Sequence, residues 1–135
     1  MKTLFKIKRL YLILLLPLIL ATTCEDDDIN SGFETEYVLE NDSSIDLILS
    51  NEGGGQTAIP SESEISIGRD LNPTTNAIVP SESFVFTSIK VYKIVNDDFI
   101  LVYVQKPIQD NLWTFNEPSE NRYEYKLTIT DELLD

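Results

Sequence analysis

The chain has 135 residues, which suffices for one domain and hardly for two. Its 23 acidic residues outnumber 10 basic ones, and this acidity argues against nucleic acid or an anionic lipid surface as partner, since both attract basic faces. There is no histidine, the commonest general base and metal ligand, and a single cysteine forms no intramolecular disulfide.

The first 23 residues have the order of a secretory signal peptide. Four of the basic residues lie within the first nine positions, and an apolar run from Leu10 to Ala21, interrupted by Pro17, follows them. The run is shorter than the roughly 20 residues that a membrane-spanning helix needs. We therefore expect a helical, cleaved signal peptide over residues 1–23, with a retained N-terminal anchor as the alternative. Cleavage leaves six basic residues against 23 acidic ones, a formal charge of −17.

The only cysteine lies between the apolar run and four acids. The segment Leu20-Ala21-Thr22-Thr23-Cys24 resembles the lipobox of bacterial lipoproteins. Leucine stands one place earlier than is usual there, and threonine precedes the cysteine where a smaller residue is usual, a looser pattern that is similar to lipoproteins of the Bacteroidota. The resemblance implies that Cys24 carries the lipid and becomes the first residue of the mature protein. Several acyl chains, each methylene contributing about 0.8 kcal/mol, anchor a protein firmly in a membrane.

Four acids follow the cysteine directly: Glu25, Asp26, Asp27 and Asp28. An acidic run at this place resembles the signal that sends Bacteroidota lipoproteins to the outer face of the outer membrane. The resemblance thus implies a lipid-anchored protein of the outer membrane, exposed at the cell surface, with a periplasm-facing protein as the alternative. The competing interpretation of the acids is a solvated linker. Residues 24–34 lack periodicity and predict a disordered acidic tether.

The acidic stretch does not fit a calcium-binding loop. Asp26, Asp28 and Asn30 occupy the first, third and fifth positions of such a loop, but serine and tyrosine stand where glycine and glutamate are required. We therefore predict no metal site and no cofactor.

From residue 35 onward strand signals dominate. In chain order we expect a hairpin of strands 37–40 and 45–49, a mobile glycine loop at 53–55, two Pro-Ser-Glu-Ser turns at 60–63 and 80–83 that each lead into a short strand, a hairpin of two central strands at 89–95 and 99–104, and an alternating strand at 123–130. The repeated turn is interpreted as one local conformation used twice. The alternative is a pair of corners at which the chain changes sheets.

About seven short antiparallel strands within some 100 residues predict an all-β fold, an immunoglobulin-like β-sandwich over residues 35–135. A small barrel is the alternative. Residues 37–133 also resemble, more loosely, small Bacteroidota lipoproteins of uncharacterised function, through phrases such as Ser88-Ile89-Lys90-Val91-Tyr92. That resemblance implies fold and surface location but no activity. The expected core residues are Leu47, Leu49, Ile65, Ile67, Phe84, Phe86, Ile89, Val91, Leu101, Tyr103, Tyr125, Leu127 and Ile129.

No catalytic motif stands out, because phosphate-binding loops, nucleophile elbows and zinc-ligand spacings are all missing from the sequence. The leading interpretation is a lipid-anchored, non-catalytic envelope protein that serves as a structural or interaction module. The second is a surface protein that binds a glycan or another protein, with Trp113 and Phe115 as an aromatic platform. For Trp113 the competing interpretation is a plug between the sheets. The third is a hydrolase that uses paired carboxylates.

Overall fold

The computed structural model describes residues 32–72 and 76–134. The predicted signal peptide, Cys24 and the acidic run lie outside these residues. The described chain is all-β, as predicted. Its strands are β1 (Phe33–Asp42), β2 (Leu47–Ser50), β3 (Gln56–Ile59), β4 (Ser63–Asn72), β5 (Ile89–Val95), β6 (Asp98–Gln105), β7 (Thr114–Ser119) and β8 (Arg122–Thr130), and its 3₁₀ helices are Pro80–Glu82, Asp110–Leu112 and Asp131–Leu133.

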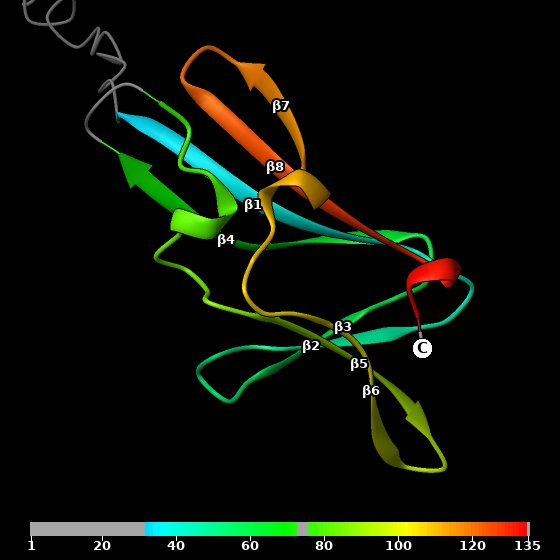
Figure 1. Cartoon of the computed structure of the whole chain (residues 1–135). Coiled ribbons are helices and arrows are strands. Elements are labelled where there is room, and N and C mark those ends of the chain that lie inside the picture. The colour runs from blue at the N-terminus through cyan, green and yellow to red at the C-terminus, as the bar shows by residue number, and fades with distance from the viewer. Residues whose placement is uncertain (1–31, 73–75, 135) are drawn as a thin grey trace, which may run out of the picture. The chain divides into compact units, whose positions relative to one another are not determined.

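The strands form two four-stranded sheets that pack as a β-sandwich (Figure 1). The first sheet has the order β4-β1-β8-β7, and the second has the order β3-β2-β5-β6. The described residues thus contain eight strands, where about seven were expected. The first strand already begins at Phe33, so that Phe33 and Glu34 of the predicted tether belong to the first sheet.

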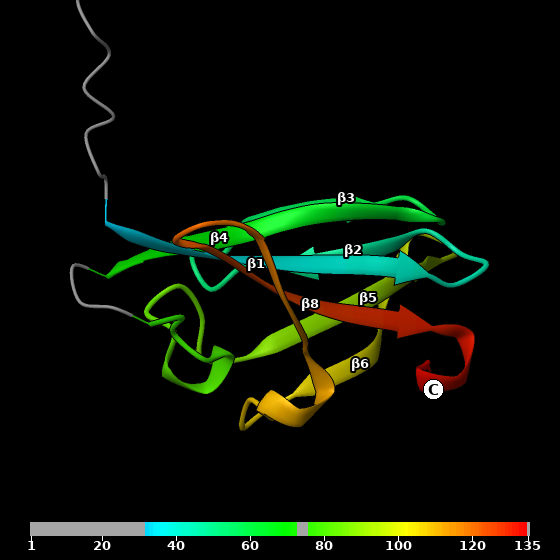
Figure 2. The same ribbon diagram turned by 90° about the horizontal axis from the view of Figure 1, so that it is seen from above.

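One strand pair is parallel, whereas we expected antiparallel strands throughout. β1 and β8 run side by side in the same direction, with Tyr37 opposite Tyr125 and Leu39 opposite Leu127 (Figure 2). Parallel neighbours need a long connection. In the described residues all the other strands lie between β1 and β8 along the chain. In this register the inward-facing residues of both strands reach the core together.

The predicted hairpin of strands 37–40 and 45–49 is wrong, because β1 and β2 belong to different sheets. Their connection is a corner built on Asn41, which is fully buried. The Asn41 Nδ2 group donates to the carbonyl oxygens of Ile45 (2.8 Å) and Ile59 (2.9 Å), and its Oδ1 accepts from the Ser43 amide (3.1 Å). One side chain therefore satisfies backbone groups that a hairpin would have satisfied by strand pairing.

The two Pro-Ser-Glu-Ser turns lie where the chain passes from one sheet to the other, which was the alternative interpretation. The turn after Pro60 joins β3 to β4, and the one after Pro80 lies between β4 and β5. Their local conformations differ. The first leads directly into a strand through Glu62 at φ 57°, whereas the second is a 3₁₀ helix.

No strand forms at residues 84–87, contrary to expectation. The amides of this segment donate to side chains instead of a neighbouring strand. The Phe84 amide bonds to Asp70 Oδ2 (3.2 Å), and the Thr87 amide bonds to Glu52 Oε1 (2.6 Å). Asp70 Oδ2 also accepts from the Tyr37 hydroxyl at 2.9 Å, and burial raises the pKa of Tyr37 far above its usual range. Phe84 itself is 91% exposed and not a core residue.

The core lies between the sheets and contains most of the expected residues. Leu101 is an exception, at 47% exposure, with Val102 buried in its place. The pairing of β5 with β6 explains the exchange: Tyr92 faces Leu101 while Val91 faces Tyr103, which leaves Val102 as an extra residue. Such a bulge reverses the alternation of side chains. The buried apolar residues are Tyr37, Val38, Leu39, Leu47, Leu49, Ile59, Phe86, Ile89, Val91, Val102, Trp113, Leu127 and Ile129.

The predicted hairpin at residues 89–104 is confirmed. Its predicted central position is right for β5, which lies between β2 and β6, and wrong for β6. β5 and β6 are joined by Asn96 and Asp97, both at positive φ (54° and 68°), as in the two-residue turns that match strand twist. β6, however, is the outermost strand of the second sheet.

Candidate functional site

Six large apolar side chains of the β5–β6 hairpin face solvent, and we call them the hairpin surface. Each is between 42% and 53% exposed. They come from both strands and from both faces of the hairpin. An apolar patch of adjacent residues on a protein surface marks an interaction site more often than scattered single residues do. The hairpin surface consists of Ile94, Val95, Phe99, Ile100, Leu101 and Val104.

The end of the β5–β6 hairpin, which carries Ile94, Val95, Phe99 and Ile100, extends beyond the neighbouring strand β2 (Figure 1). β2 pairs with β5 only through Ile48 opposite Tyr92 and Leu49 opposite Val91. β2 begins at Leu47, so the end of β5, residues 93–95, has no partner strand on that side. Apolar residues on both faces of a strand usually indicate burial on both faces. Here the apolar residues at the end of the hairpin extend beyond β2 into solvent.

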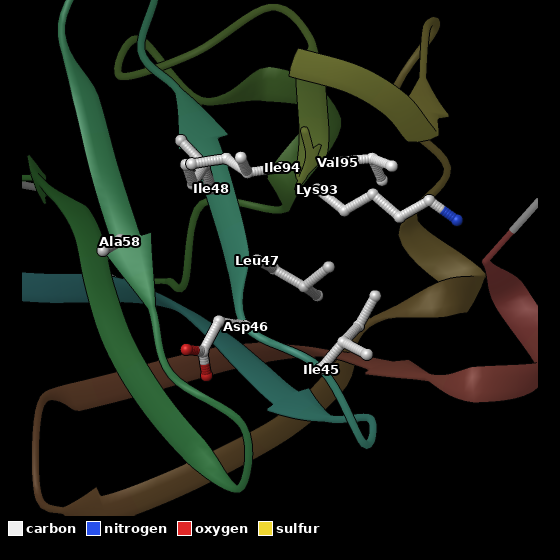
Figure 3. A pocket seen from close by; sticks show the side chains of 8 residues that line it. All are labelled: Ile45, Asp46, Leu47, Ile48, Ala58, Lys93, Ile94 and Val95. Carbon is white, nitrogen blue, oxygen red and sulfur yellow. The ribbon is translucent and has the colours of Figure 1, made fainter. Parts of the chain in front are cut away.

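A hollow of about 570 Å³ lies beside this unpaired end of β5 (Figure 3). Ile48 and Ile94 point to one side of the sheet, and Leu47, Lys93 and Val95 point to the other. Most of the residues that line the hollow are apolar. Asp46 and Lys93 are its only charged lining residues among the described positions. It suits an apolar side chain or an extended segment better than a charged small molecule.

The six basic residues of the described chain have two different environments. Arg69, Arg122 and Lys126 belong to the first sheet and form ion pairs with its glutamates. Within residues 32–72 and 76–134, no ion pair includes Lys90, Lys93 or Lys106, which flank the hairpin surface. The hairpin thus combines exposed apolar side chains with lysines that form no ion pair among the described residues.

The outer face of the first sheet is, in contrast, saturated with polar contacts. Glu34 bonds to Arg69 Nη1 (3.2 Å) and to Arg122, and Lys126 Nζ lies 2.6 Å from Glu64 Oε2. The Glu64 carboxylate raises the pKa of Lys126 above its usual value. Glu34, Glu36, Glu40 and Glu64 each have a basic partner, and the arrangement is that of a solvated structural face.

Trp113 does not form the predicted platform, because its ring is buried at 6% exposure. Its Nε1 donates to Gln105 Oε1 at 3.1 Å, and its ring stacks on Phe86 with centroids 5.6 Å apart. The tryptophan is a core residue, which was the competing interpretation.

Phe115, the other platform residue, is 50% exposed and lies among tyrosines of the neighbouring strand. Its ring centroid is 6.0 Å from that of Tyr123 and 5.2 Å from that of Tyr125. Tyr123 also stacks on Phe33. The alternating pattern of residues 123–130 predicts the strand that carries these tyrosines, but it does not predict their contact with Phe115, because the β7–β8 register is not visible in the sequence.

The predicted lipid-attachment residue Cys24 and the acids Glu25–Asp28 lie outside the described residues. Within the part of the chain that the structure describes, no group of three or more cysteine, aspartate or glutamate side chains is placed to hold a metal ion. In the same residues, no helix has the length and apolar character needed to cross a membrane.

No protein-family model matches the chain, and neither a curated protein nor a solved structure does. The functional interpretation therefore rests on the residues and their geometry.

Proposed function

We propose that the chain is a lipid-anchored protein of the bacterial outer membrane whose β-sandwich serves as a non-catalytic protein-interaction module. The observation that carries the proposal is the hairpin surface, in which six large apolar side chains of one hairpin face solvent. Keeping such a patch in water is unfavourable by about 25 cal/mol for each Å² of apolar area. A surface of this kind is stabilised when another protein covers it.

The membrane is a poor occupant for the same surface. Two carboxylates, Asp97 and Asp98, lie at the tip of the hairpin, the part that would enter the bilayer first. Placing a carboxylate at the centre of a bilayer costs several kcal/mol. A protein partner that leaves the tip in water avoids this cost.

Site-specific photo-crosslinking tests the interaction module. A photoreactive residue in place of Leu101 should give a covalent adduct in cells. The same residue in place of Leu71, a 68% exposed leucine on the edge strand β4, should give none. Equal labelling from both positions, or no adduct from Leu101, would contradict the proposal.

The anchor is tested separately at Cys24. The substitution Cys24→Ala should abolish incorporation of labelled fatty acid and move the protein from the membrane to the soluble fraction. A mutant that stays in the membrane would show that the lipobox interpretation is wrong. Replacing Glu25–Asp28 by alanine should keep acylation and reduce cleavage by protease added to whole cells.

A second candidate function, glycan binding, is favoured by the aromatic cluster of Phe115, Tyr123 and Tyr125. Exposed aromatic rings stack on the apolar faces of sugars. Phe115→Ala should then abolish retention of the protein on a glycan array while Leu101→Lys leaves it unchanged. An array on which the unaltered protein binds no glycan would dismiss this candidate.

A further inference from the structure

The four edge strands of the two sheets differ in how they are protected from pairing with another chain. Natural proteins keep edges short or place charges and proline on them. β3 has four residues, β4 carries charged residues such as Glu64 and Arg69, and β7 contains Glu117 and Pro118. β6 has eight residues, and no charge or proline occurs in its segment Phe99–Gln105. The bulge at Val102 interrupts the register with β5 at one position, between the segments Asp98–Leu101 and Tyr103–Gln105.

We infer that β6 pairs antiparallel with β6 of a second copy of this chain, which joins the two second sheets into one continuous eight-stranded sheet. The inference rests on the proposed interaction module and names its partner. The β6 edge of each copy would pair with that of the other, and the exposed side chains Phe99, Leu101 and Val104 of one copy would lie along the same strand of its partner. Pairing of this kind satisfies the free backbone groups of both edges at once.

The charges at the two ends of β6 favour a second copy in this orientation. The strand begins with Asp98, which follows Asp97, and Lys106 comes directly after its last residue. Antiparallel pairing centred near Leu101 brings the acids of each copy beside Lys106 of the other, twice across the two-fold axis. A parallel arrangement would place acid against acid, which costs free energy. Among the described residues Lys106 has no ion-pair partner within its own chain.

Sedimentation of the full-length, acylated chain in detergent tests the inference through a charge exchange. The unaltered protein should sediment as two copies. The single variants Asp98→Lys and Lys106→Asp should each weaken association by about tenfold or more, because each places like charges side by side. The double variant should restore association to within about threefold of the unaltered protein, since the exchanged charges meet again across the two-fold axis. Leu101→Lys should give single copies, and Leu71→Lys should sediment like the unaltered protein.

The outcomes separate the inference from the proposed function. A single-copy protein that still gives the Leu101 photo-adduct with a different protein overturns the second copy and keeps the interaction module. A dimer that the double variant does not restore overturns antiparallel β6 pairing. A single-copy protein without any Leu101 adduct overturns both.

Discussion

The outer face of the first sheet and the β5–β6 hairpin of the second sheet are both built from β-strands, but they present different side chains to solvent. The first sheet closes its surface with ion pairs such as Glu34–Arg69 and Glu64–Lys126. The hairpin leaves Ile94, Phe99 and Leu101 in solvent beside lysines that have no ion pair among the described residues. The difference shows that two edge regions of one domain can present opposite surfaces: charged side chains pair across β4 and β1, whereas apolar side chains stay exposed on β5 and β6.

The largest effect should follow from removing a buried aromatic ring, for comparison with an exposed one. Trp113→Ala should lower the free energy of unfolding by about 3–5 kcal/mol, because it leaves a cavity against Phe86 and Tyr37. Phe115→Ala, at a half-exposed ring, should cost about 1 kcal/mol or less. Urea unfolding followed by circular dichroism measures both. Equal costs would contradict the assignment of Trp113 to the core.

The corner between the two sheets should be the next most sensitive position. Asn41→Ala removes the side-chain donor to the Ile59 carbonyl and one of the two side-chain donors to the Ile45 carbonyl, which should cost about 2–3 kcal/mol. Asn51→Ala removes a single exposed hydrogen bond to Thr57 and should change the same urea midpoint little. If both variants unfold alike, the corner does not depend on the buried amide.

Acid should loosen the attachment of residues 87–88 before it affects the hairpin. Hydrogen bonds from Thr87, and then from Ser88, hold the pKa of Glu52 below its ordinary value of 4.5. A carboxyl whose pKa is lowered in the folded state adds stability above its ordinary pKa and loses it as the pH falls through the folded value. Glu52→Gln should therefore flatten the pH dependence of stability below about pH 4.5. Thermal unfolding of both proteins between pH 3 and 7 tests this, and identical acid profiles would count against the contact.

The smallest effect on stability should come from the hairpin itself. Leu101→Lys replaces a side chain that is exposed in the single copy, so at a dilution where the protein does not associate the free energy of unfolding should change by about 0.5 kcal/mol or less, as for Leu71→Lys. Association should nevertheless be lost only with Leu101→Lys. A large loss of stability in that variant would mean that Leu101 belongs to the core and would remove the contrast between the two surfaces.

The local elements of the fold follow from the sequence, and the long-range ones do not. The alternation at residues 123–130 and the polar Asn96-Asp97 turn predicted β8 and the β5–β6 hairpin correctly. The edge position of β6 depends on strand order, which no local pattern encodes. A corner stands where a hairpin was expected. It contains the side chain of Asn41, whose partners Ile59 and Pro60 lie 18 and 19 residues away in the sequence.

The candidate site was missed for the same reason. The run from Phe99 to Val104 is apolar on both faces and predicted burial on both faces. The short pairing of β2 with β5 leaves the end of the hairpin with Phe99 and Ile100 exposed, and the bulge at Val102 exposes Leu101. Trp113 was a candidate in two opposite roles, and its hydrogen bond to Gln105 and stacking on Phe86 place it in the core. Lipidation at Cys24 stays a prediction.

Hydrogen–deuterium exchange across β6 in the membrane-bound, full-length protein tests most directly whether its free edge is occupied. If the β6 edge pairs with another strand, amides within Phe99–Val104 should exchange at least about tenfold more slowly in the unaltered protein than in Leu101→Lys, because that pairing protects them. Amides of β7, the edge with Glu117 and Pro118, should exchange equally in both proteins. Equal exchange of the β6 amides in the two proteins would contradict the pairing of the β6 edge with another strand.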